Sequence, residues 1–457
     1  MMTSSSTSRL LAEWDRTYLW HPFTQMREWM QEPPLIIERG DGPYLIDTEG
    51  RRYLDGVSSI WVNVHGHRHP TLDRALRRQL RSIAHSTLLG LSNPPAIRLA
   101  RELVRLAPPG LTRVFYSDNG STAVEIALKM AVQYWQQQAP SAEAKRTFVH
   151  LQLAYHGDTV GGMSVGGIEL FQKRFAPLLF PTIAAEPPYC YRCPLKLTYP
   201  SCKMACLDPV EAILKRRHRE IAGLIIEPLV QAAAGMVTAP PGYLRRIRDL
   251  CTRYRVLLVA DEVATGFGRT GRMFACDHEA VTPDLMALSK GLTGGYLPLA
   301  ATLATEEIYR AFLGEYNDWK TFFHGHSYTG NPLGCAVALA NLSIFRTERT
   351  LARVKARIPI LTRLLRPLAR LPHVGDIRQR GYMLGIELVR DRRTKAAYPM
   401  TDRIGHRVAM DARRQGLVIR PLGNVIALMP PLSTKVRELR RMVGIVSRSI
   451  RAVTERE

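Results

Sequence analysis

Short apolar runs alternate with amphipathic stretches through the middle of the chain, from about residue 71 to residue 334. Apolar positions at helical spacing, as in residues 209–217 and 244–254, predict amphipathic helices. The apolar runs between such stretches are short and rich in aliphatic residues, which is typical of strands buried on both faces. They predict strands at residues 113–117, 148–153, 223–227, 256–261, 285–289 and 300–304. Helices and strands that alternate in this way predict an α/β fold with a mostly parallel sheet between two layers of helices.

The two ends of the chain carry a different pattern. Residues 36–53 contain short apolar runs separated by Gly-containing turns, and the region after residue 332 begins with a long helical stretch and continues with short strands and helices. Since 457 residues are too many for one compact core, we expect a large domain and a small α+β domain built from both chain ends. The predicted division gives residues 1–70 and 333–457 to the small domain and residues 71–332 to the large one.

Composition narrows the class of protein. Hydrophobic residues make up 46% of the chain and charged residues 23%, which is ordinary for a globular enzyme. No apolar run reaches the roughly 18 residues of a membrane helix. The polar start of the chain, MMTSSSTS, lacks the apolar stretch of a signal peptide. We therefore expect a cytoplasmic protein without a membrane partner.

The formal net charge of +23 raises the question of nucleic-acid binding. Basic residues occur along the whole chain, and no zinc-finger, homeodomain or RNA-motif signature accompanies them. We interpret the charge as an arginine-rich, solvated surface and expect no nucleic-acid partner. The positive electrostatic potential of such a surface still favours anionic ligands that carry phosphate.

Four of the seven cysteines lie close together in the sequence, at Cys190, Cys193, Cys202 and Cys206. Their spacing resembles that of a structural zinc site. Several prolines crowd the same segment, and a surface loop with reduced thiols, or one closed by a disulfide, explains the cysteines as well. We assign no metal to this loop.

Two of the predicted strands end on charged residues. The run at 256–260 leads directly into Asp261, and the run at 285–289 leads into Lys290. Ligands of open α/β sheets bind along the carboxyl edge of the strands, so both side chains are expected at that edge. An amine that forms a Schiff base and an acid that keeps a ring nitrogen protonated suit pyridoxal 5'-phosphate (PLP). The alternatives are a helix cap or a salt bridge for Asp261 and a surface position for Lys290.

A phosphate site is predicted after the first of these strands. The strand at 113–117 is followed by a tight polar turn, and Gly120 and Ser121 stand where a helix begins. Such a turn presents free backbone N–H groups and the positive end of the helix dipole to an anion. Thr122 and Glu125 have the spacing of a capping box, so an ordinary capped helix is the alternative.

Three further features are candidates for ligand contacts. Tyr155 follows the strand at 148–153 and can stack on a flat heterocycle, or it is a tyrosine of the core. Arg420 lies among apolar residues and is expected to bind a carboxylate, either of a bound acid or of a protein side chain. The segment 321–332 is rich in hydroxyl groups and glycine, and it can bind a phosphate or cap the next helix.

Taken together, the motifs resemble the class-III PLP-dependent aminotransferases of fold type I, over nearly the whole chain. That resemblance is carried by DEVATGFGRTG at residues 261–271, SKG at 289–291 and GNP at 330–332. Within the family, the chain is most similar to the branch that converts 8-amino-7-oxononanoate to 7,8-diaminononanoate in biotin biosynthesis. The narrower resemblance is carried by WHPFTQM at residues 20–26, DGVSSIW at 55–61, HGH at 65–67, IRPLG at 419–423 and LMPP at 428–431.

The resemblance implies how the cofactor PLP would be bound. Lys290 would be the catalytic residue, which holds PLP as a Schiff base and moves a proton during the reaction. Asp261 would pair with the ring nitrogen, and Tyr155 would stack on the ring. The phosphate would be bound by Gly120 and Ser121 and, from the partner subunit of a homodimer, by His326 and Ser327.

The resemblance also implies a site for small-molecule substrates, 8-amino-7-oxononanoate and an amino donor. Arg420 would bind the carboxylate of the keto acid, and Gly325 would line its path. Trp61 and Ile60 would shape an apolar channel, and Arg269 would lie near the donor. The substrate-facing residues on this basis are Phe23, Ile60, Trp61, Tyr155, Lys290, Gly325 and Arg420.

Two positions bear on the identity of the amino donor. Members of the family that use S-adenosylmethionine carry tyrosine where Phe23 stands and tryptophan where Ile60 stands. A related branch takes lysine, and SSIWVNV at residues 58–64 is closer to that branch. We expect S-adenosylmethionine, with lysine as the alternative; an aminotransferase for another ω-amino acid or diamine shares the core motifs. A nicotinamide enzyme is disfavoured, because no G-x-G-x-x-G follows the first apolar strand.

Overall fold

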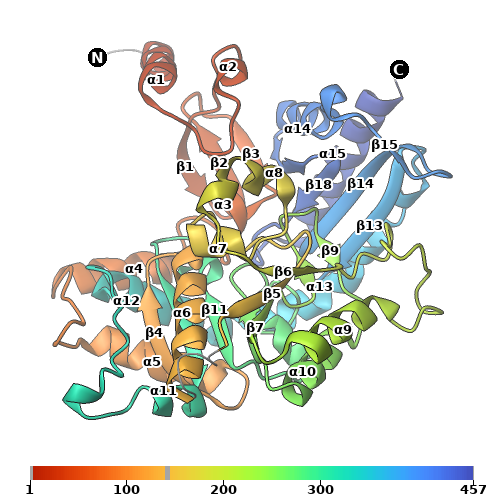
Figure 1. Cartoon of the computed structure of the whole chain (residues 1–457). Helices are drawn as coiled ribbons and strands as arrows, with labels where there is room; N and C mark the ends of the chain where they lie inside the picture. Colours follow the sequence, from red (N-terminus) through yellow and green to blue (C-terminus); the bar gives the residue numbers. More distant parts are fainter. Residues whose placement is uncertain (1–3, 139–144, 456–457) are drawn as a thin grey trace.

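The computed structural model describes residues 4–138 and 145–455. Its largest sheet has seven strands in the order β4–β12–β11–β10–β7–β5–β6 (Figure 1). Neighbouring strands pair in parallel except β12, which is antiparallel to both β11 and β4. The predicted α/β fold with a mostly parallel sheet is confirmed, with one reversed strand. The strands are β4 (Leu111–Ser117), β5 (Thr147–Leu151), β6 (Ile183–Ala185), β7 (Ile221–Ile226), β10 (Leu257–Asp261), β11 (Leu285–Leu288) and β12 (Ala300–Thr305).

Helices cover both faces of this sheet. In β10 every residue is buried. Leu257 and Val259 belong to the apolar cluster that includes α6, whereas Leu258 and Ala260 belong to the cluster that includes α10. Because both faces meet apolar neighbours, the strand has a continuous apolar sequence rather than an alternating one. The surrounding helices are α4 (Pro70–Leu80), α5 (Pro94–Leu106), α6 (Gly120–Gln138), α9 (Asp208–Arg217), α10 (Tyr243–Arg253), α11 (Glu306–Ala311) and α12 (Pro332–Thr347).

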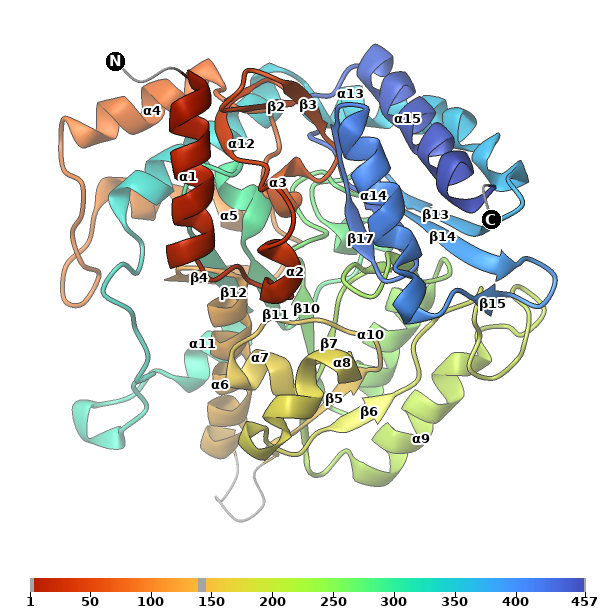
Figure 2. The same ribbon diagram turned by 90° about the horizontal axis from the view of Figure 1, so that it is seen from above.

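Two smaller sheets, of four and five strands, lie beside the large one (Figure 2), and β8 (Val230–Gln231) pairs with β9 (Val237–Thr238) in a third sheet of two strands. Strand β16 pairs in parallel with β3, so segments near the two ends of the chain share one sheet. The first small sheet contains β1 (Ile37–Asp41), β2 (Tyr44–Asp47), β3 (Arg52–Asp55) and β16 (Leu417–Val418). The second contains β13 (Val374–Arg380), β14 (Met383–Asp391), β15 (Ala396–Ala397), β17 (Arg420–Leu422) and β18 (Val425–Leu428). The domain boundaries proposed from the sequence stay a prediction.

The remaining helices surround these small sheets and the site. Helices α14 and α15 pack against each other, and α13 packs against α15. In Figure 1, α1 and α2 lie at the top of the molecule. These helices are α1 (Ser4–Tyr18), α2 (Met26–Trp29), α3 (Ser58–Trp61), α7 (Val160–Ser164), α8 (Glu169–Gln172), α13 (Thr350–Leu365), α14 (Ile404–Arg414) and α15 (Val436–Thr454).

A buried charged cluster fastens the cysteine-containing loop to the second small sheet. Glu387 of β14 accepts hydrogen bonds from Tyr189, Arg192 and Arg378. Arg378 also donates to the backbone oxygen of Gly235, at 2.9 Å. Breaking a buried, hydrogen-bonded ion pair is costly, so this cluster fixes the loop against the sheet.

The structure shows how the four cysteines of the loop are arranged and whether any described helix could span a membrane. Cys190, Cys193, Cys202 and Cys206 are free thiols that line one small cavity under the loop. Among the described residues, no group of three or more His, Cys, Asp or Glu side chains is arranged to hold a metal ion. None of the described helices combines the length and the hydropathy that a membrane span requires.

Candidate functional site

The candidate site is a cavity of about 680 Å³ at the carboxyl edge of the large sheet. Loops that follow β4, β5, β7, β10 and β11 line it, together with the loop that leads into the reversed strand β12. The cavity therefore lies where open α/β sheets bind their ligands. Six residues predicted from the sequence lie together in its lining: Trp61, Gly120, Ser121, Tyr155, Asp261 and Lys290.

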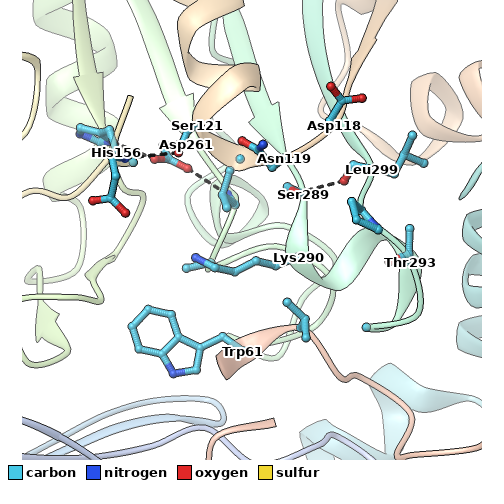
Figure 3. Close-up of a pocket in the computed structure, with 18 of the residues that line it drawn as sticks. Trp61, Asp118, Asn119, Ser121, His156, Asp261, Ser289, Lys290, Thr293 and Leu299 are labelled. Carbon is cyan, nitrogen blue, oxygen red and sulfur yellow. Dashed lines mark hydrogen bonds and ion pairs between the residues drawn. The ribbon is translucent and has the colours of Figure 1, made fainter. Parts of the chain in front are cut away.

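Lys290 and Asp261 come from neighbouring parallel strands and face the same cavity (Figure 3). Burial lowers the pKa of the Lys290 amine, Asp261 and Glu227 oppose this shift, and Arg269 adds to it. The backbone of Lys290 has a φ of +41°, in the left-handed region. Strained backbone of this kind is concentrated at functional sites. The surface position considered for Lys290 from the sequence is thus wrong.

The carboxylate of Asp261 is held in place from both sides. One oxygen accepts a hydrogen bond from the backbone N–H of Val263 at 3.0 Å. The other lies 2.7 Å from Nδ1 of His156, which is itself buried. These contacts fix the plane of the carboxylate at the cavity wall. The sequence placed His156 beside Tyr155 but gave no sign that it would meet Asp261.

The turn at the start of α6 forms a cradle at one end of the cavity. Gly120 begins the helix, and Ser121 accepts a 3.4 Å hydrogen bond from the backbone N–H of Asp158. A Cβ atom at Gly157 would lie 2.1 Å from Oγ of Ser121, so only glycine leaves this approach open. The helix N-terminus and the serine hydroxyl suit an anionic group such as a phosphate.

Helix α6 is capped, as the alternative from the sequence allowed, but not by a box of Thr122 and Glu125. The side chain of Asn119 accepts from the backbone N–H of Thr122 at 3.1 Å and takes the capping position. Glu125 instead accepts hydrogen bonds from the backbone N–H groups of Gly161 and Gly162, at 2.6 and 3.3 Å. The carboxylate therefore fastens the start of α7 to α6, a contact between two helices that sequence spacing does not reveal.

Tyr155 stands at the side of the cavity with a fixed backbone and hydroxyl. Its backbone N–H donates to Glu227 at 3.1 Å, and its hydroxyl donates to Asp158 at 2.7 Å. Burial raises the pKa of Tyr155, and burial also raises the pKa of Glu227 to about 7. An edge-on aromatic series leads outward from Tyr155 through Phe171 to Phe23, with ring centroids 6.1 and 5.2 Å apart. Phe171 was not a candidate from the sequence.

Other predicted residues lie outside the cavity lining. His326 lies next to it, because its Nδ1 is 2.6 Å from the carboxylate of Asp118, a lining residue. Ser327 is exposed, and Gly325 lines a separate cavity with Leu89 and His324. The outlying residues are Phe23, Ile60, Gly325, His326, Ser327 and Arg420.

Arg420 on β17 and Arg269 differ in their surroundings. The half-buried guanidinium of Arg420 makes no hydrogen bond or ion pair within residues 4–138 and 145–455, so the protein carboxylate considered from the sequence is absent there. Arg269, predicted near the donor, is only 1% exposed, does not line the cavity, and hydrogen-bonds to the backbone oxygens of Trp61, Asn63 and Pro430.

Comparison with known proteins agrees with this geometry. The profile of the family described as Aminotransferase class-III matches residues 25–450. The chain is 58% identical to the adenosylmethionine-8-amino-7-oxononanoate aminotransferase of Nitratidesulfovibrio vulgaris, over 99% of this chain and 83% of that protein. It is 53% identical to the protein of the same name from Geobacter sulfurreducens, over 98% of each chain.

Solved structures agree as well. The crystal structure of adenosylmethionine-8-amino-7-oxononanoate aminotransferase from Methanocaldococcus jannaschii superposes with a TM-score of 0.93 at 46% identity, over 97% of this chain and 99% of that one. A PLP-bound amine transaminase from an uncultivated Pseudomonas species gives a TM-score of 0.91 at 37% identity, over 95% and 99% of the chains.

The cradle at Ser121 can be tested through Gly157. Gly157→Ala pushes a methyl group against Ser121, and we expect PLP affinity to fall about tenfold, or about 1.4 kcal/mol, within the usual cost of overpacking. Gly50→Ala is the matched control, because Gly50 also has a positive φ (+81°) but its Cβ would meet open space. Titration of each apoprotein with PLP measures the affinities. Unchanged PLP affinity in Gly157→Ala would show that the phosphate binds elsewhere.

Proposed function

Because the chain belongs to the class-III aminotransferase family, we propose that it transfers an amino group to 8-amino-7-oxononanoate and forms 7,8-diaminononanoate in biotin biosynthesis. Relatives named for this reaction at 58% and 53% identity support the choice of acceptor. The observation that carries the proposal is the shared cavity of Lys290 and Asp261, since an amine and a carboxylate at one site fit PLP.

The residues of the cavity fit PLP group by group. Lys290 offers an amine for the aldehyde, Asp261 an acid for the ring nitrogen, and Tyr155 an aromatic face at the side of the cavity. Gly120 and Ser121 offer the N-terminus of α6 to the phosphate. When bound, PLP supplies an electron-withdrawing ring that stabilises negative charge on the reacting carbon.

We assign the proton transfer to Nζ of Lys290. The lowered pKa of this amine leaves more of it neutral near physiological pH, and a neutral amine can accept a proton from the substrate and return it. Asp261 remains oriented during these steps because His156 and the N–H of Val263 hold its two oxygens. Glu227 holds the loop of Tyr155 through a backbone N–H.

Arg420 is the proposed binding group for the carboxylate of the keto acid. Its guanidinium makes no hydrogen bond or ion pair to the described protein groups, and an arginine in partly apolar surroundings binds carboxylates well. Trp61 lines the cavity, and Ile60 and Gly325 are proposed to guide the aliphatic chain of the substrate.

For the amino donor we propose S-adenosylmethionine, as in the names of the relatives. Phe23 would meet the donor at the outer end of the aromatic series that runs through Phe171 to Tyr155. A phenylalanine and an isoleucine, Ile60, offer no hydrogen-bond donor there, which keeps lysine as the alternative.

A homodimer is part of the proposal. Leu89, Leu91, Phe323 and Tyr328 expose more than half of their surface, from 62% to 69%, and exposed apolar groups on adjoining segments mark protein interfaces. The two segments adjoin, since Leu89 and Gly325 line the same cavity. Within such a dimer, His326 and Ser327 of one subunit would reach the phosphate bound by the other.

The pH dependence of PLP capture tests the state of Lys290. Only the neutral amine attacks the aldehyde, so the capture rate rises with pH through the pKa of Lys290. Because burial lowers that pKa, we expect a midpoint below the usual lysine value of about 10.4. Stopped-flow absorbance of apoprotein and PLP measures the rate, with Nα-acetyl-lysine as the reference amine. A midpoint at or above that of the reference would contradict the assignment.

Replacement of Arg420 tests the carboxylate contact. Arg420→Ala should raise the KM of the keto acid by about 10- to 100-fold, the equivalent of about 1.5–3 kcal/mol for charge-assisted hydrogen bonds. The KM of the donor should change little. Arg414→Ala serves as the control, because this side chain is 77% exposed. An equal rise in both KM values would argue against a clamp for the keto acid.

A donor screen tests the function as a whole. The PLP-loaded protein is incubated with 8-amino-7-oxononanoate and either S-adenosylmethionine, lysine, ornithine or 4-aminobutyrate, and 7,8-diaminononanoate is measured by mass spectrometry. We expect the diamine with S-adenosylmethionine. If the diamine forms only with lysine, lysine is the amino donor and S-adenosylmethionine is not. If no donor gives the diamine, but the protein transfers an amino group from an ω-amine to pyruvate, 8-amino-7-oxononanoate is not the acceptor.

A further inference from the structure

Four consecutive residues beside the cavity adopt left-handed backbone geometry. Ser58, Ser59, Ile60 and Trp61 have φ angles of +48°, +41°, +61° and +70°, and none of them is glycine. The backbone N–H of Trp61 donates to Val57 at 2.6 Å, so the segment α3 is a single left-handed helical turn. Such geometry is unfavourable for residues with a Cβ atom, above all for a β-branched one, and persists only where the surroundings enforce it.

Asp55 holds the first half of the turn. Its side chain is fully buried and accepts hydrogen bonds from the backbone N–H groups of Val57 and Ser59, at 3.2 and 2.9 Å. It also accepts a 2.9 Å bond from the hydroxyl of Ser59. The carboxylate thus satisfies N–H groups that a left-handed turn leaves without partners.

Arg269 holds both ends of the turn. Its terminal nitrogens donate to Oγ of Ser58 at 3.1 Å and to the backbone oxygens of Trp61 and Asn63 at 3.2 and 3.0 Å. A fourth bond, of 2.8 Å, goes to the oxygen of Pro430. All four acceptors are neutral, and burial lowers the pKa of this guanidinium to about 9. A buried guanidinium whose hydrogen bonds all go to neutral oxygens indicates that the left-handed turn is required.

The turn carries the aromatic wall of the cavity. The ring centroid of Trp61 lies 5.1 Å from Nζ of Lys290, and Figure 3 shows the indole next to the amine. Trp61 is 6% exposed, whereas Ile60, one residue earlier on the turn, is 50% exposed. The direction of both side chains therefore depends on the left-handed backbone.

We propose that Arg269 is a positioning residue, which holds the left-handed turn of Ser58–Trp61 and thereby keeps the Trp61 indole against the amine of Lys290. Arg269 acts through the turn and not by contact with the donor. In this role the Trp61 indole shields the amine of Lys290 from water. The contacts of Arg269 with the turn therefore affect the half-reaction of the donor and that of the acceptor equally. The contacts of Arg269 with the turn are the same whichever amino donor the protein uses.

The central variant is Arg269→Lys, which keeps the positive charge but cannot present two N–H groups in one plane. We expect kcat/KM to fall about tenfold for donor and acceptor alike, the equivalent of about 1.4 kcal/mol. The pH midpoint of PLP capture by the apoprotein should move up toward that of free lysine, since water then reaches the amine. The other charged groups that act on Lys290, namely Asp261, Glu227 and Asp158, are unchanged.

A second substitution tests whether the effect passes through the turn. Ser59 has an exposed side chain, and Gly adopts a positive φ freely, so Ser59→Gly should restore part of the lost kcat/KM and the midpoint in Arg269→Lys. Ser59→Pro, which cannot take a positive φ, should reproduce the Arg269→Lys defects with Arg269 intact. Arg272→Lys, at an exposed arginine of the same loop, is the control for the charge-preserving change.

Two results would overturn the inference. One is an Arg269→Lys protein in which only the KM of the donor rises and the midpoint of PLP capture stays in place, which would indicate direct donor contact. The other is a Ser59→Pro protein that equals the wild type in both measurements. If Arg269→Lys does not fold, Ser59→Pro alone shows whether the left-handed turn is needed for kcat/KM and for the midpoint of PLP capture. If the wild-type protein captures PLP through Lys290 but forms no diamine in the donor screen, the proposed function is refuted. The inference about Arg269 then still stands.

Discussion

The proximity of one amine and one carboxylate at the edge of a buried sheet is the interaction on which the rest of the site depends. Lys290 and Asp261 leave neighbouring parallel strands, β11 and β10, at the same edge. Burial of both groups requires fixed partners, and His156 and the N–H of Val263 hold the carboxylate. The same burial lowers the pKa of the amine, which favours the neutral form that can act as a nucleophile and a proton acceptor.

The buried strands could be predicted because their sequence is constrained on both faces. Each residue of β10 meets apolar neighbours, so the continuous apolar run marks the strand without ambiguity. The reversed direction of β12 could not be predicted, because an apolar run carries no sign of its direction. The three-residue strand β6 was missed, since its Ile183–Ala185 run is too short to stand out from a loop.

The site was predictable where a side chain follows a strand and unpredictable where tertiary contacts decide. Lys290 and Asp261 were predicted from the ends of two apolar runs. The contacts of Glu125 could not be predicted, because the spacing of a capping box does not reveal which backbone groups approach in space. The left-handed turn at Ser58–Trp61 contains no glycine to mark it, and the burial of Arg269 depends on a distant part of the chain.

Reductive trapping identifies the lysine that carries PLP. The PLP-loaded protein is treated with borohydride, digested, and mapped by mass spectrometry for the lysine that carries the reduced cofactor. The account predicts a single modified peptide with the label on Lys290. A label on another lysine, or a protein that binds PLP without any trapped lysine, would contradict it.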